Sequence, residues 1–249
     1  MRRLWERLRQ GYRTIDFPKG HTELPPRFRG RPGLDPSRCQ ADCRRCADVC
    51  PTAAIKTQPL SLDLGACLFC PACAEACAHG AITFSNDFRL AARTRGDLVL
   101  SGREMRLAAA LDRKLRKIFG RSLKLRQVSA GGCSACEADL NVTGTVVFDL
   151  GRFGIQFVAS PRHADGIVVT GPVTTNMALA LRETYAAVPE PKLVIAAGAC
   201  AIGGGPFAGA ALCADGIPAD IPVDLYLPGC PPHPLTVLDG LLRLLGRIE

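Results

Sequence analysis

Twelve of the thirteen cysteines in this chain stand at spacings that suit metal ligation. One pair, Cys133 and Cys136, lies in the run 131–137, after a strand-like stretch and before a helix-like one. Two thiolates three residues apart can bind one iron ion or one corner of an iron–sulfur cluster. Cys200 and Cys230 each lie just past another strand-like run. We therefore predict that these four cysteines gather at strand ends and form one iron–sulfur site.

The N-terminal half carries two runs of four cysteines with nearly the same spacing. The runs read Cys39-x3-Cys43-x2-Cys46-x3-Cys50 and Cys67-x2-Cys70-x2-Cys73-x3-Cys77. Each run is followed by a strand-like Ala-Ile pair, Ala54-Ile55 or Ala81-Ile82, so the segment is an internal repeat. A turn between close cysteines points thiolates and backbone N–H groups at one cluster, and the N–H dipoles stabilise its negative charge. A pair of zinc ribbons is the alternative interpretation.

The composition indicates a globular protein that keeps its thiols reduced. Apolar residues make up 47% of the chain, enough for a packed core. The start, MRRLWERLRQ, is charged throughout, so we expect no secretory signal and a cytosolic setting in which dense cysteine indicates metal binding. The uncharged run 193–214 is long enough to span a bilayer but holds five glycines and a proline. We predict a strand and a glycine-rich loop there instead.

The net charge of +8 is concentrated in two segments. Residues 1–38 hold ten Lys and Arg against four acids, and residues 101–126 hold nine against two. The segments thus carry +6 and +7, which leaves −5 for the remainder. We interpret them as docking surfaces for an acidic partner or anionic lipid headgroups, or as solvated charge without a partner. Because no nucleic-acid-binding motif occurs, we expect no nucleic-acid partner.

Both basic segments contain an amphipathic pattern. Residues 1–38 begin with apolar residues at helical spacing: Leu4, Trp5, Leu8 and Tyr12. A proline-rich extended stretch follows, so we predict an arm that lies on another surface. Trp5 would contact a membrane or a neighbouring subunit, or pack internally. In the connector 91–124, a second set predicts a basic helix ending at Gly120: Leu107, Leu111, Leu115 and Ile118. That helix would lie on a membrane, on a partner or on its own domain.

From residue 125 onward, strand-like and helix-like runs alternate, which is typical of an α/β fold with a mostly parallel sheet. The expected strands are 125–128, 154–159, 166–170, 192–197 and 223–227. The expected helices are 136–150, 174–188 and 234–248. Sites in such sheets form beyond the carboxyl ends of the strands, so cysteines almost a hundred residues apart can meet there.

This C-terminal half resembles the small electron-transfer subunit of energy-converting nickel–iron hydrogenases such as formate hydrogenlyase. The same family includes the complex I subunit that carries the last cluster before quinone. The resemblance is carried by five blocks, Gly131–Glu137, Ser160–Asp165, Thr170–Thr174, Gly198–Gly204 and Pro228–Pro232. Complex I subunits typically carry two adjacent cysteines at the first position, whereas two residues separate Cys133 and Cys136, as in the hydrogenase branch. The resemblance implies a flavodoxin-like fold and a proximal 4Fe-4S cluster held by Cys133, Cys136, Cys200 and Cys230.

The N-terminal half resembles bacterial ferredoxins with two 4Fe-4S clusters, and in particular the two-cluster ferredoxin subunit of the same complexes. The second likeness rests on Phe28–Pro32 and on Cys67-Leu68-Phe69-Cys70. In this family the fourth cysteine of each run binds the other cluster. The resemblance thus implies cluster 1 on Cys39, Cys43, Cys46 and Cys77, and cluster 2 on Cys67, Cys70, Cys73 and Cys50. The chain departs from the family pattern in an extra residue before Cys43 and in Ala78, where proline is usual.

Taken together, the resemblances imply a fusion of two subunits. We expect a basic arm at 1–38, an α+β ferredoxin-like domain at 39–90, a connector at 91–124 and the α/β domain at 125–249. The expected function is electron relay through three 4Fe-4S clusters, as a peripheral subunit on the cytoplasmic face of the inner membrane. Expected partners are a catalytic large subunit of hydrogenase type, the membrane subunits, and formate dehydrogenase or ferredoxin as donor.

Three alternatives to this function stay open. One is a complex I-like module that reduces quinone, and another is a hydrogenase-related complex whose large subunit lacks nickel. The third is a zinc-stabilised scaffold without redox work. The chain itself has no cysteine pair left for nickel, and no Ser-His-Asp order, phosphate loop or dinucleotide fingerprint occurs.

Several residues near the cysteines have more than one interpretation. Glu137 would complement a helix dipole, or tune the cluster and relay protons. His163 and Asp165 would contact a partner or anchor hydrogen bonds. His233 would donate to a cluster sulfur or face the large subunit, and His79 is expected to be exposed.

Two further features stand beside the predicted ligands. Cys213 lies outside every quartet and is expected to be a small buried apolar residue. The run Gly203–Gly205 is expected to let the backbone approach the cluster closely.

Overall fold

A five-stranded parallel sheet organises the C-terminal half of the computed structural model, which describes residues 2–20, 22–102 and 104–249. Its strands are β6 (Leu123–Ser129), β7 (Ile155–Phe157), β8 (Gly166–Thr170), β9 (Leu193–Ala197) and β10 (Leu225–Leu227). They lie in the order β10-β9-β8-β6-β7, and every pairing is parallel. This is the flavodoxin-like strand order, so the predicted α/β fold is confirmed.

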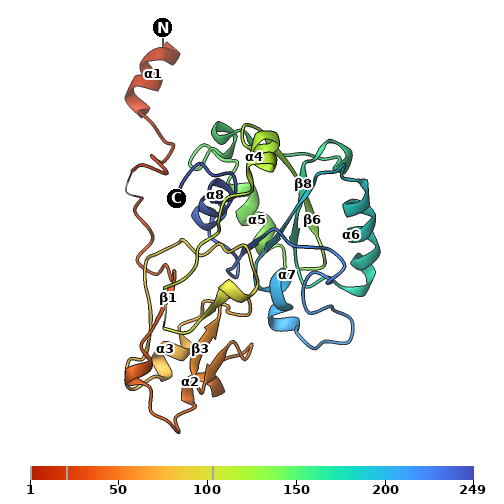
Figure 1. Ribbon diagram of the computed structural model, residues 1–249. Helices are drawn as coiled ribbons and strands as arrows, with labels where there is room; N and C mark the ends of the chain where they lie inside the picture. The colour runs from red at the N-terminus through yellow and green to blue at the C-terminus, as the bar shows by residue number, and fades with distance from the viewer. Residues whose placement is uncertain (1, 21, 103) are drawn as a thin grey trace.

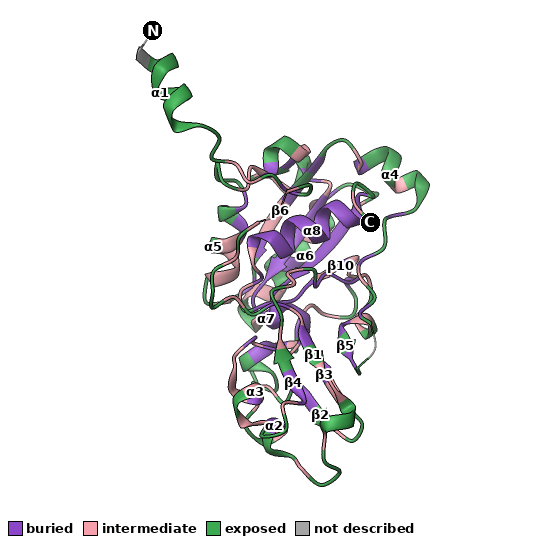
Figure 2. Cartoon of the chain, turned by 90° about the vertical axis from the view of Figure 1, so that its left-hand side faces the viewer, coloured by how far each residue is buried: buried purple, intermediate pink, exposed green. Residues whose placement is uncertain are grey.

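Helices cover both faces of this sheet (Figure 1). They are α5 (Ala135–Val142), α6 (Thr175–Ala187), α7 (Ala199–Gly203) and α8 (Pro234–Leu244). All residues of α8 are buried, and its leucines pack in one core with Leu125 and Ile195 (Figure 2). Leu181 of α6 packs in a second core with Val169 and Val194. Successive strand residues thus point to opposite cores, as the pleat requires.

The predicted elements of this half are present, and some are shorter than expected. Strand β8 has the predicted bounds, and α6 differs by one residue at each end. The helix expected at 136–150 ends at Val142, where the buried Thr143 hydroxyl donates to the carbonyl oxygen of Leu140 at 2.6 Å. This side-chain bond competes with the helix ladder. Short 3-10 turns are η1 (Pro36–Arg38), η2 (Gly96–Leu98), η3 (Leu150–Phe153), η4 (Pro161–His163) and η5 (Gly205–Phe207).

The N-terminal half holds two small antiparallel sheets. In one, β1 (Pro32–Leu34) pairs with β4 (Ile82–Phe84). In the other, β3 (Leu60–Asp63) lies between β2 (Ile55–Thr57) and β5 (Val99–Leu100). Each cysteine run includes one short helix, α2 (Arg45–Asp48) or α3 (Ala72–Ala76), before the strand that starts at Ile55 or Ile82. The two runs therefore repeat in structure as they do in sequence.

The two halves share a core. Cys46, Cys67 and Cys73 are buried in the same cluster as Ala201 and Ile202 of α7. The ion pair between Arg95 and Asp63, with Nη1 and Oδ1 2.6 Å apart, lies at the same boundary, since an added Cβ on Gly65 would contact both Arg95 and Ile202. The cysteine-rich half is thus packed directly against the glycine-rich end of the sheet.

The arm begins with α1 (Arg2–Gln10), which projects away from the body (Figures 1 and 2). Leu4, Trp5 and Leu8 are 68–70% exposed. The following stretch returns to the body, where Ile15 N donates to Val147 O at 2.9 Å and Phe17 is buried in the main core. The stretch after α1 therefore lies on a surface, as expected, and that surface belongs to the body of this same chain.

The connector helix is shorter than predicted. Helix α4 spans Arg113–Phe119, so the expected helical spacing from Leu107 to Ile118 was wrong at its start. Asp112 begins the helix by accepting hydrogen bonds from the N–H groups of Lys114 and Leu115. Leu111 instead donates its N–H to Leu244 O and is buried in the main core. Helix α4 therefore packs on its own domain, and Gly120 follows its last residue as expected.

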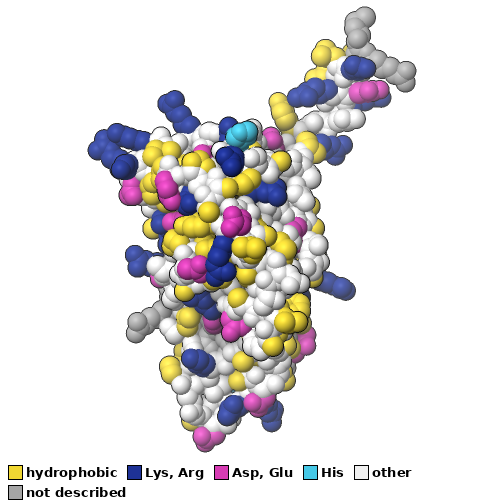
Figure 3. Space-filling model, turned by 90° about the vertical axis from the view of Figure 1, so that its right-hand side faces the viewer, with side chains coloured by type: hydrophobic (Ala, Val, Ile, Leu, Met, Phe, Trp, Pro, Cys, Tyr) yellow, Lys and Arg dark blue, Asp and Glu magenta, His cyan; other side chains and the backbone are white. Residues whose placement is uncertain are grey.

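The basic side chains of α4 remain exposed, and Lys and Arg side chains gather at one upper corner of the body in Figure 3. No helix within the described ranges is both long and apolar enough to span a bilayer. The uncharged run 193–214 forms β9, α7 and loops, as predicted.

Candidate metal centres

Four cysteines meet at the carboxyl edge of the five-stranded sheet. Cys133 and Cys136 follow β6, Cys200 lies in α7 after β9, and Cys230 follows β10. Burial, with the neighbouring sulfurs of Cys200, Cys230 and Cys133, raises the pKa of the Cys136 thiol to about 12. Burial and the sulfurs of Cys230 and Cys133 likewise raise the pKa of Cys200 to about 11, and the sulfur of Cys213 and the carboxylate of Glu137 contribute. We call these four residues the proximal group.

Two glycines let the backbone approach these sulfurs. An added Cβ on Gly198 would lie 2.5 Å from Cys136 Sγ, and one on Gly205 would lie 3.0 Å from Cys200 Sγ. Both glycines have positive φ angles, +91° and +53°, which side chains rarely adopt. The expected close approach of Gly203–Gly205 is therefore present at Gly205, and Gly198 adds a second one.

Glu137 stands beside the proximal group in the first turn of α5. Its Oε1 accepts hydrogen bonds from the hydroxyls of Ser129 and Thr170, both at 2.6 Å. Burial opposes ionisation, but these bonds outweigh it and hold the pKa of Glu137 below its ordinary value. The carboxylate is thus fixed at the ends of β6 and β8, where the strand order reverses.

Cys39, Cys43, Cys46 and Cys77 line one small hollow together with Leu60 and Ile82. Burial raises the pKa of Cys46, and the sulfurs of Cys77 and Cys39 contribute. The Ala81 N–H donates to Cys77 Sγ at 3.3 Å. These four residues, group 1, combine three cysteines of the first run with the last cysteine of the second.

Cys50, the last cysteine of the first run, lies near three cysteines of the second run instead: Cys67, Cys70 and Cys73. Burial raises the pKa of Cys67 to about 12 and that of Cys73 to about 11, and Cys50 and Cys70 contribute to both. Backbone N–H groups donate to Cys67 Sγ from Phe69 and to Cys50 Sγ from Ala54, each at 3.3 Å. We call these four residues group 2. The exchange of Cys50 and Cys77 between runs follows from the packing of α2 against α3.

The chemistry of each group fits a four-iron cluster. Such a cluster takes one thiolate at each corner and is stabilised by N–H groups aimed at sulfur. Within the described part of the chain, no three His, Cys, Asp or Glu side chains are arranged to hold a single metal ion. Six of these thiols have raised pKa values, so they are protonated when free, and binding of iron would release their protons: Cys46, Cys67, Cys73, Cys136, Cys200 and Cys230.

The other candidate residues lie in varied settings. His79 is exposed, as expected, and lines the hollow of group 1. Asp165 anchors hydrogen bonds, because its Oδ2 accepts from the Lys124 N–H at 2.7 Å, and His163 is exposed nearby. Cys213 is only half-buried, in a loop bridged to Thr174.

His233 has a structural role that the sequence did not indicate. It caps α8, where its Nδ1 accepts from the Leu235 N–H at 3.2 Å, and its ring lies between those of Phe28 and Phe148. Sequence reasoning also missed the roles of Ser129 and Thr170, although Thr170 begins one of the resemblance blocks.

Comparison with known proteins identifies the family of the C-terminal half. The family described as NADH ubiquinone oxidoreductase, 20 Kd subunit, matches residues 133–244, starting at the first proximal cysteine. An NADH-quinone oxidoreductase subunit of Heliobacterium modesticaldum is 45% identical over 121 residues, which cover 48% of this chain and 69% of that protein. The chain belongs to this family. It is therefore a subunit of an oxidoreductase, and the resemblance of the C-terminal half is confirmed.

Subunits of hydrogenases and of a related membrane complex are also similar to this chain. The probable membrane-bound hydrogenase subunit mbhJ of Pyrococcus furiosus is 39% identical over 135 residues, covering 54% of this chain and 81% of that protein. Formate hydrogenlyase subunit 7 of Escherichia coli is 40% identical over 141 residues, covering 57% of this chain and 55% of that protein. A chain of the membrane-bound sulfane sulfur reductase, an archaeal respiratory membrane complex, is 34% identical, with a TM-score of 0.47 over 53% of this chain and 73% of that one.

Proposed function

We propose that this chain is the electron-transfer subunit of a membrane-associated, energy-converting nickel–iron hydrogenase complex of the formate hydrogenlyase type. It would relay single electrons through three 4Fe-4S clusters to or from a catalytic large subunit. The observation that carries the proposal is the gathering of twelve cysteines into three groups of four.

Each group has a proposed role. Cys39, Cys43, Cys46 and Cys77 hold cluster 1, and Cys67, Cys70, Cys73 and Cys50 hold cluster 2. Cys133, Cys136, Cys200 and Cys230 hold the proximal cluster. When bound, these clusters accept and release one electron at a time. The chain's own residues bury the sulfurs and direct N–H groups at them, and the two halves share a core that holds the groups next to each other.

The proposed domain organisation follows from these roles. A ferredoxin-like unit at 39–90 carries clusters 1 and 2, and strands β1 and β5 from the flanking arm and connector complete its sheets. The α/β unit at 125–249 carries the proximal cluster. Fusion of two such units fixes the placement of the clusters, which matters because electron tunnelling weakens steeply with distance.

A complex I-like module that reduces quinone is the second candidate, because NADH-quinone oxidoreductase subunits are among the most similar relatives. The spacing of Cys133 and Cys136 favours the hydrogenase branch. A neighbouring gene for a large subunit with two nickel-binding cysteine pairs would support the first candidate, and a large subunit without those pairs would support the second.

We further propose peripheral attachment to the cytoplasmic face of the inner membrane, with formate dehydrogenase or ferredoxin as electron donor. Two hydrogenase-related relatives carry names that refer to membrane-bound or formate-linked enzymes. The exposed basic helix α1, with Trp5, Leu4 and Leu8 on its surface, is the proposed contact with anionic lipid.

The test is iron and acid-labile sulfide analysis of the anaerobically purified and reconstituted chain, with EPR after reduction. We expect about twelve iron atoms per chain and three 4Fe-4S signals. A colourless protein that contains zinc would instead establish the scaffold alternative, and far fewer than twelve iron atoms would contradict the three-cluster relay.

A further inference from the structure

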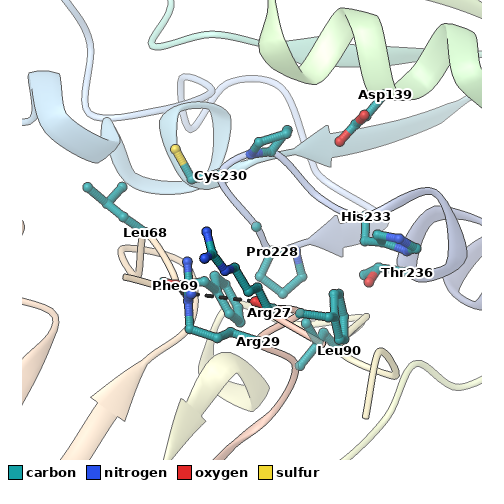
Figure 4. Close-up of a pocket in the computed structure, with 13 residues that line it drawn as sticks. Arg27, Arg29, Leu68, Phe69, Leu90, Asp139, Pro228, Cys230, His233 and Thr236 are labelled. Atoms are coloured by element: carbon teal, nitrogen blue, oxygen red, sulfur yellow. Dashed lines mark hydrogen bonds between the residues drawn. The ribbon is translucent and has the colours of Figure 1, made fainter. Parts of the chain in front are cut away.

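The ligand turn of group 2 faces the Cys230 loop of the proximal group across a hollow of about 240 Å³ (Figure 4). Leu68 and Phe69, between Cys67 and Cys70, line one side, and residues 228–231 line the other. The two cysteine groups are therefore next to each other at this point, and the width of the hollow contributes to the distance between them.

A segment of the arm, Phe28 and Arg29, contacts both sides of this hollow. Arg29 Nε donates to the carbonyl oxygen of Phe69 at 2.6 Å, which ties the arm to the group 2 turn. The ring of Phe28 meets the ring of His233 edge to face, with centroids 5.0 Å apart. His233 caps α8 only three residues after Cys230, so consecutive arm residues connect the two ligand turns.

The arm segment is itself held in place. The N–H groups of Gly30 and Arg31 donate to the carbonyl oxygens of Ser85 and Asp87, each at 2.7 Å. Arg31 also forms an ion pair with Asp87 at 3.0 Å. A Cβ on Gly30 would lie 2.2 Å from Asp87 O, so only glycine allows this approach. Phe28 and Arg29 thus project from an anchored backbone.

We propose that Phe28 and Arg29 are positioning residues that hold the group 2 and proximal turns at a fixed separation. The inference rests on the proposed function, because it concerns the passage of one electron between cluster 2 and the proximal cluster. In that step one cluster loses an electron and the other gains it, and no bond forms or breaks. A clamp that keeps the turns together keeps this electron transfer fast.

Arg27 provides a matched control. Its side chain lines the same hollow and carries the same charge as that of Arg29. Among the described residues the Arg27 side chain makes no hydrogen bond or ion pair. The Arg29 side chain donates to Phe69 O, and its Nη1 also donates to the carbonyl oxygen of Arg27 at 3.5 Å, a bond that needs only the Arg27 backbone. Loss of charge near the clusters is therefore common to Arg27→Gln and Arg29→Gln, and loss of the clamp is specific to Arg29→Gln.

The experiment uses both variants of the full chain, reconstituted anaerobically with iron and sulfide. The readouts are the spin–spin interaction between the two reduced clusters by EPR, the midpoint potentials, and the intercluster rate after rapid reduction. For Arg29→Gln we expect a weaker spin–spin interaction and a lower rate than in the unmodified chain, because without this hydrogen bond the two turns can move apart and tunnelling weakens steeply with distance. Arg27→Gln should keep both at the level of the unmodified chain.

Equal changes in both variants, seen as shifts in midpoint potential, would assign the arginines to charge tuning and overturn the clamp. So would an unchanged rate in Arg29→Gln at full iron content. If Arg29→Gln does not retain iron, Phe28→Leu is the variant to test, because it keeps an apolar side chain and removes the ring contact with His233. A lower intercluster rate in Phe28→Leu supports the clamp, and an unchanged rate overturns it. Failure of the proposed function is separate, since the unmodified chain would then hold fewer than three clusters.

Discussion

At the scale of single residues, the proposed proximal site depends on what lies next to each sulfur. Cys136 Sγ is so close to Gly198 that a methyl group at that position would overlap it. Cys200 has the same relation to Gly205. Because glycine has no side chain, its backbone can pack against one side of each sulfur. The other side of the sulfur is then left for a cluster.

Gly198→Ala should remove the proximal cluster. The added Cβ would lie 2.5 Å from Cys136 Sγ, at a φ of +91°. Backbone strain alone should lower the free energy of unfolding by about 1–3 kcal/mol. Iron content, EPR and thermal unfolding measure the effects.

Gly209→Ala is the matched control for this substitution. Gly209 also has a positive φ, +78°, but an added Cβ would meet nothing within 4 Å. It should therefore show strain without loss of a cluster. A fully occupied proximal cluster in Gly198→Ala would contradict the proposed geometry.

Cys136→Ala should remove one EPR signal and about four iron atoms while clusters 1 and 2 remain. The reason is that groups 1 and 2 draw all their ligands from residues 39–77. Cys213→Ala, outside the three groups, should retain all three signals. Simultaneous loss of every signal in Cys136→Ala would show that the division into two cluster-bearing units is wrong.

At the scale of elements, two helices with similar basic amphipathic patterns have different surroundings. Phe119, the last residue of α4, is buried in the main core, and so is Leu111, two residues before the helix begins. Leu4, Trp5 and Leu8 of α1 stay exposed. An amphipathic pattern predicts which side of a helix is buried against an apolar surface. Whether the helix's own domain provides that surface depends on the position of the helix in the chain.

Trp5 should report the proposed lipid contact of α1. It is the only tryptophan in the chain, so its fluorescence is unambiguous. With anionic vesicles we expect a blue shift that high salt reduces, because the arginines of α1 attract anionic headgroups. Leu8→Ser should weaken the shift, and Lys117→Gln on α4 should not. An equal shift with neutral vesicles, or none with anionic ones, would argue against this contact.

At the scale of the whole molecule, α8 connects the parts of the chain. The Thr236 hydroxyl donates to Phe88 O at 2.8 Å, and Leu244 O accepts from Leu111. The helix also carries a buried ion pair, in which Arg243 Nε donates to Asp239 Oδ2 at 2.9 Å, with side chains 9% and 3% exposed. The connector and the sheet therefore both pack against α8, and each helps to bury the apolar side chains of the others.

Asp239→Asn should lower the free energy of unfolding by about 3–5 kcal/mol, because it leaves the buried Arg243 charge without its partner. Denaturant unfolding followed by circular dichroism measures the loss. Asp220→Asn breaks the Arg182–Asp220 pair, whose side chains are 48% and 57% exposed, and should have no measurable effect. Similar losses in the two variants would contradict the argument from burial.

Much of the fold could be predicted from local pattern. The apolar run 166–170 is strand β8, and the repeated cysteine spacing corresponds to two repeated helix–strand units. The connector helix was predicted too long because Leu107 and Leu111 matched a helical period, although Asp112 starts the helix and Leu111 bonds α8. Periodicity reports burial, and burial of an extended segment can imitate the helical period.

By itself, the sequence determined the α/β class of the C-terminal half and the family, and it predicted which cysteines bind clusters, because these depend on residue type and short spacing. The resemblance to two-cluster ferredoxins already predicted that Cys50 and Cys77 exchange groups. Only the tertiary structure decided that Glu137 is held by Ser129 and Thr170, and that Arg29 reaches Phe69. These contacts join residues that lie 8, 33 and 40 positions apart along the chain. No local preference encodes such a contact, which exists only once the packed elements bring its two ends together.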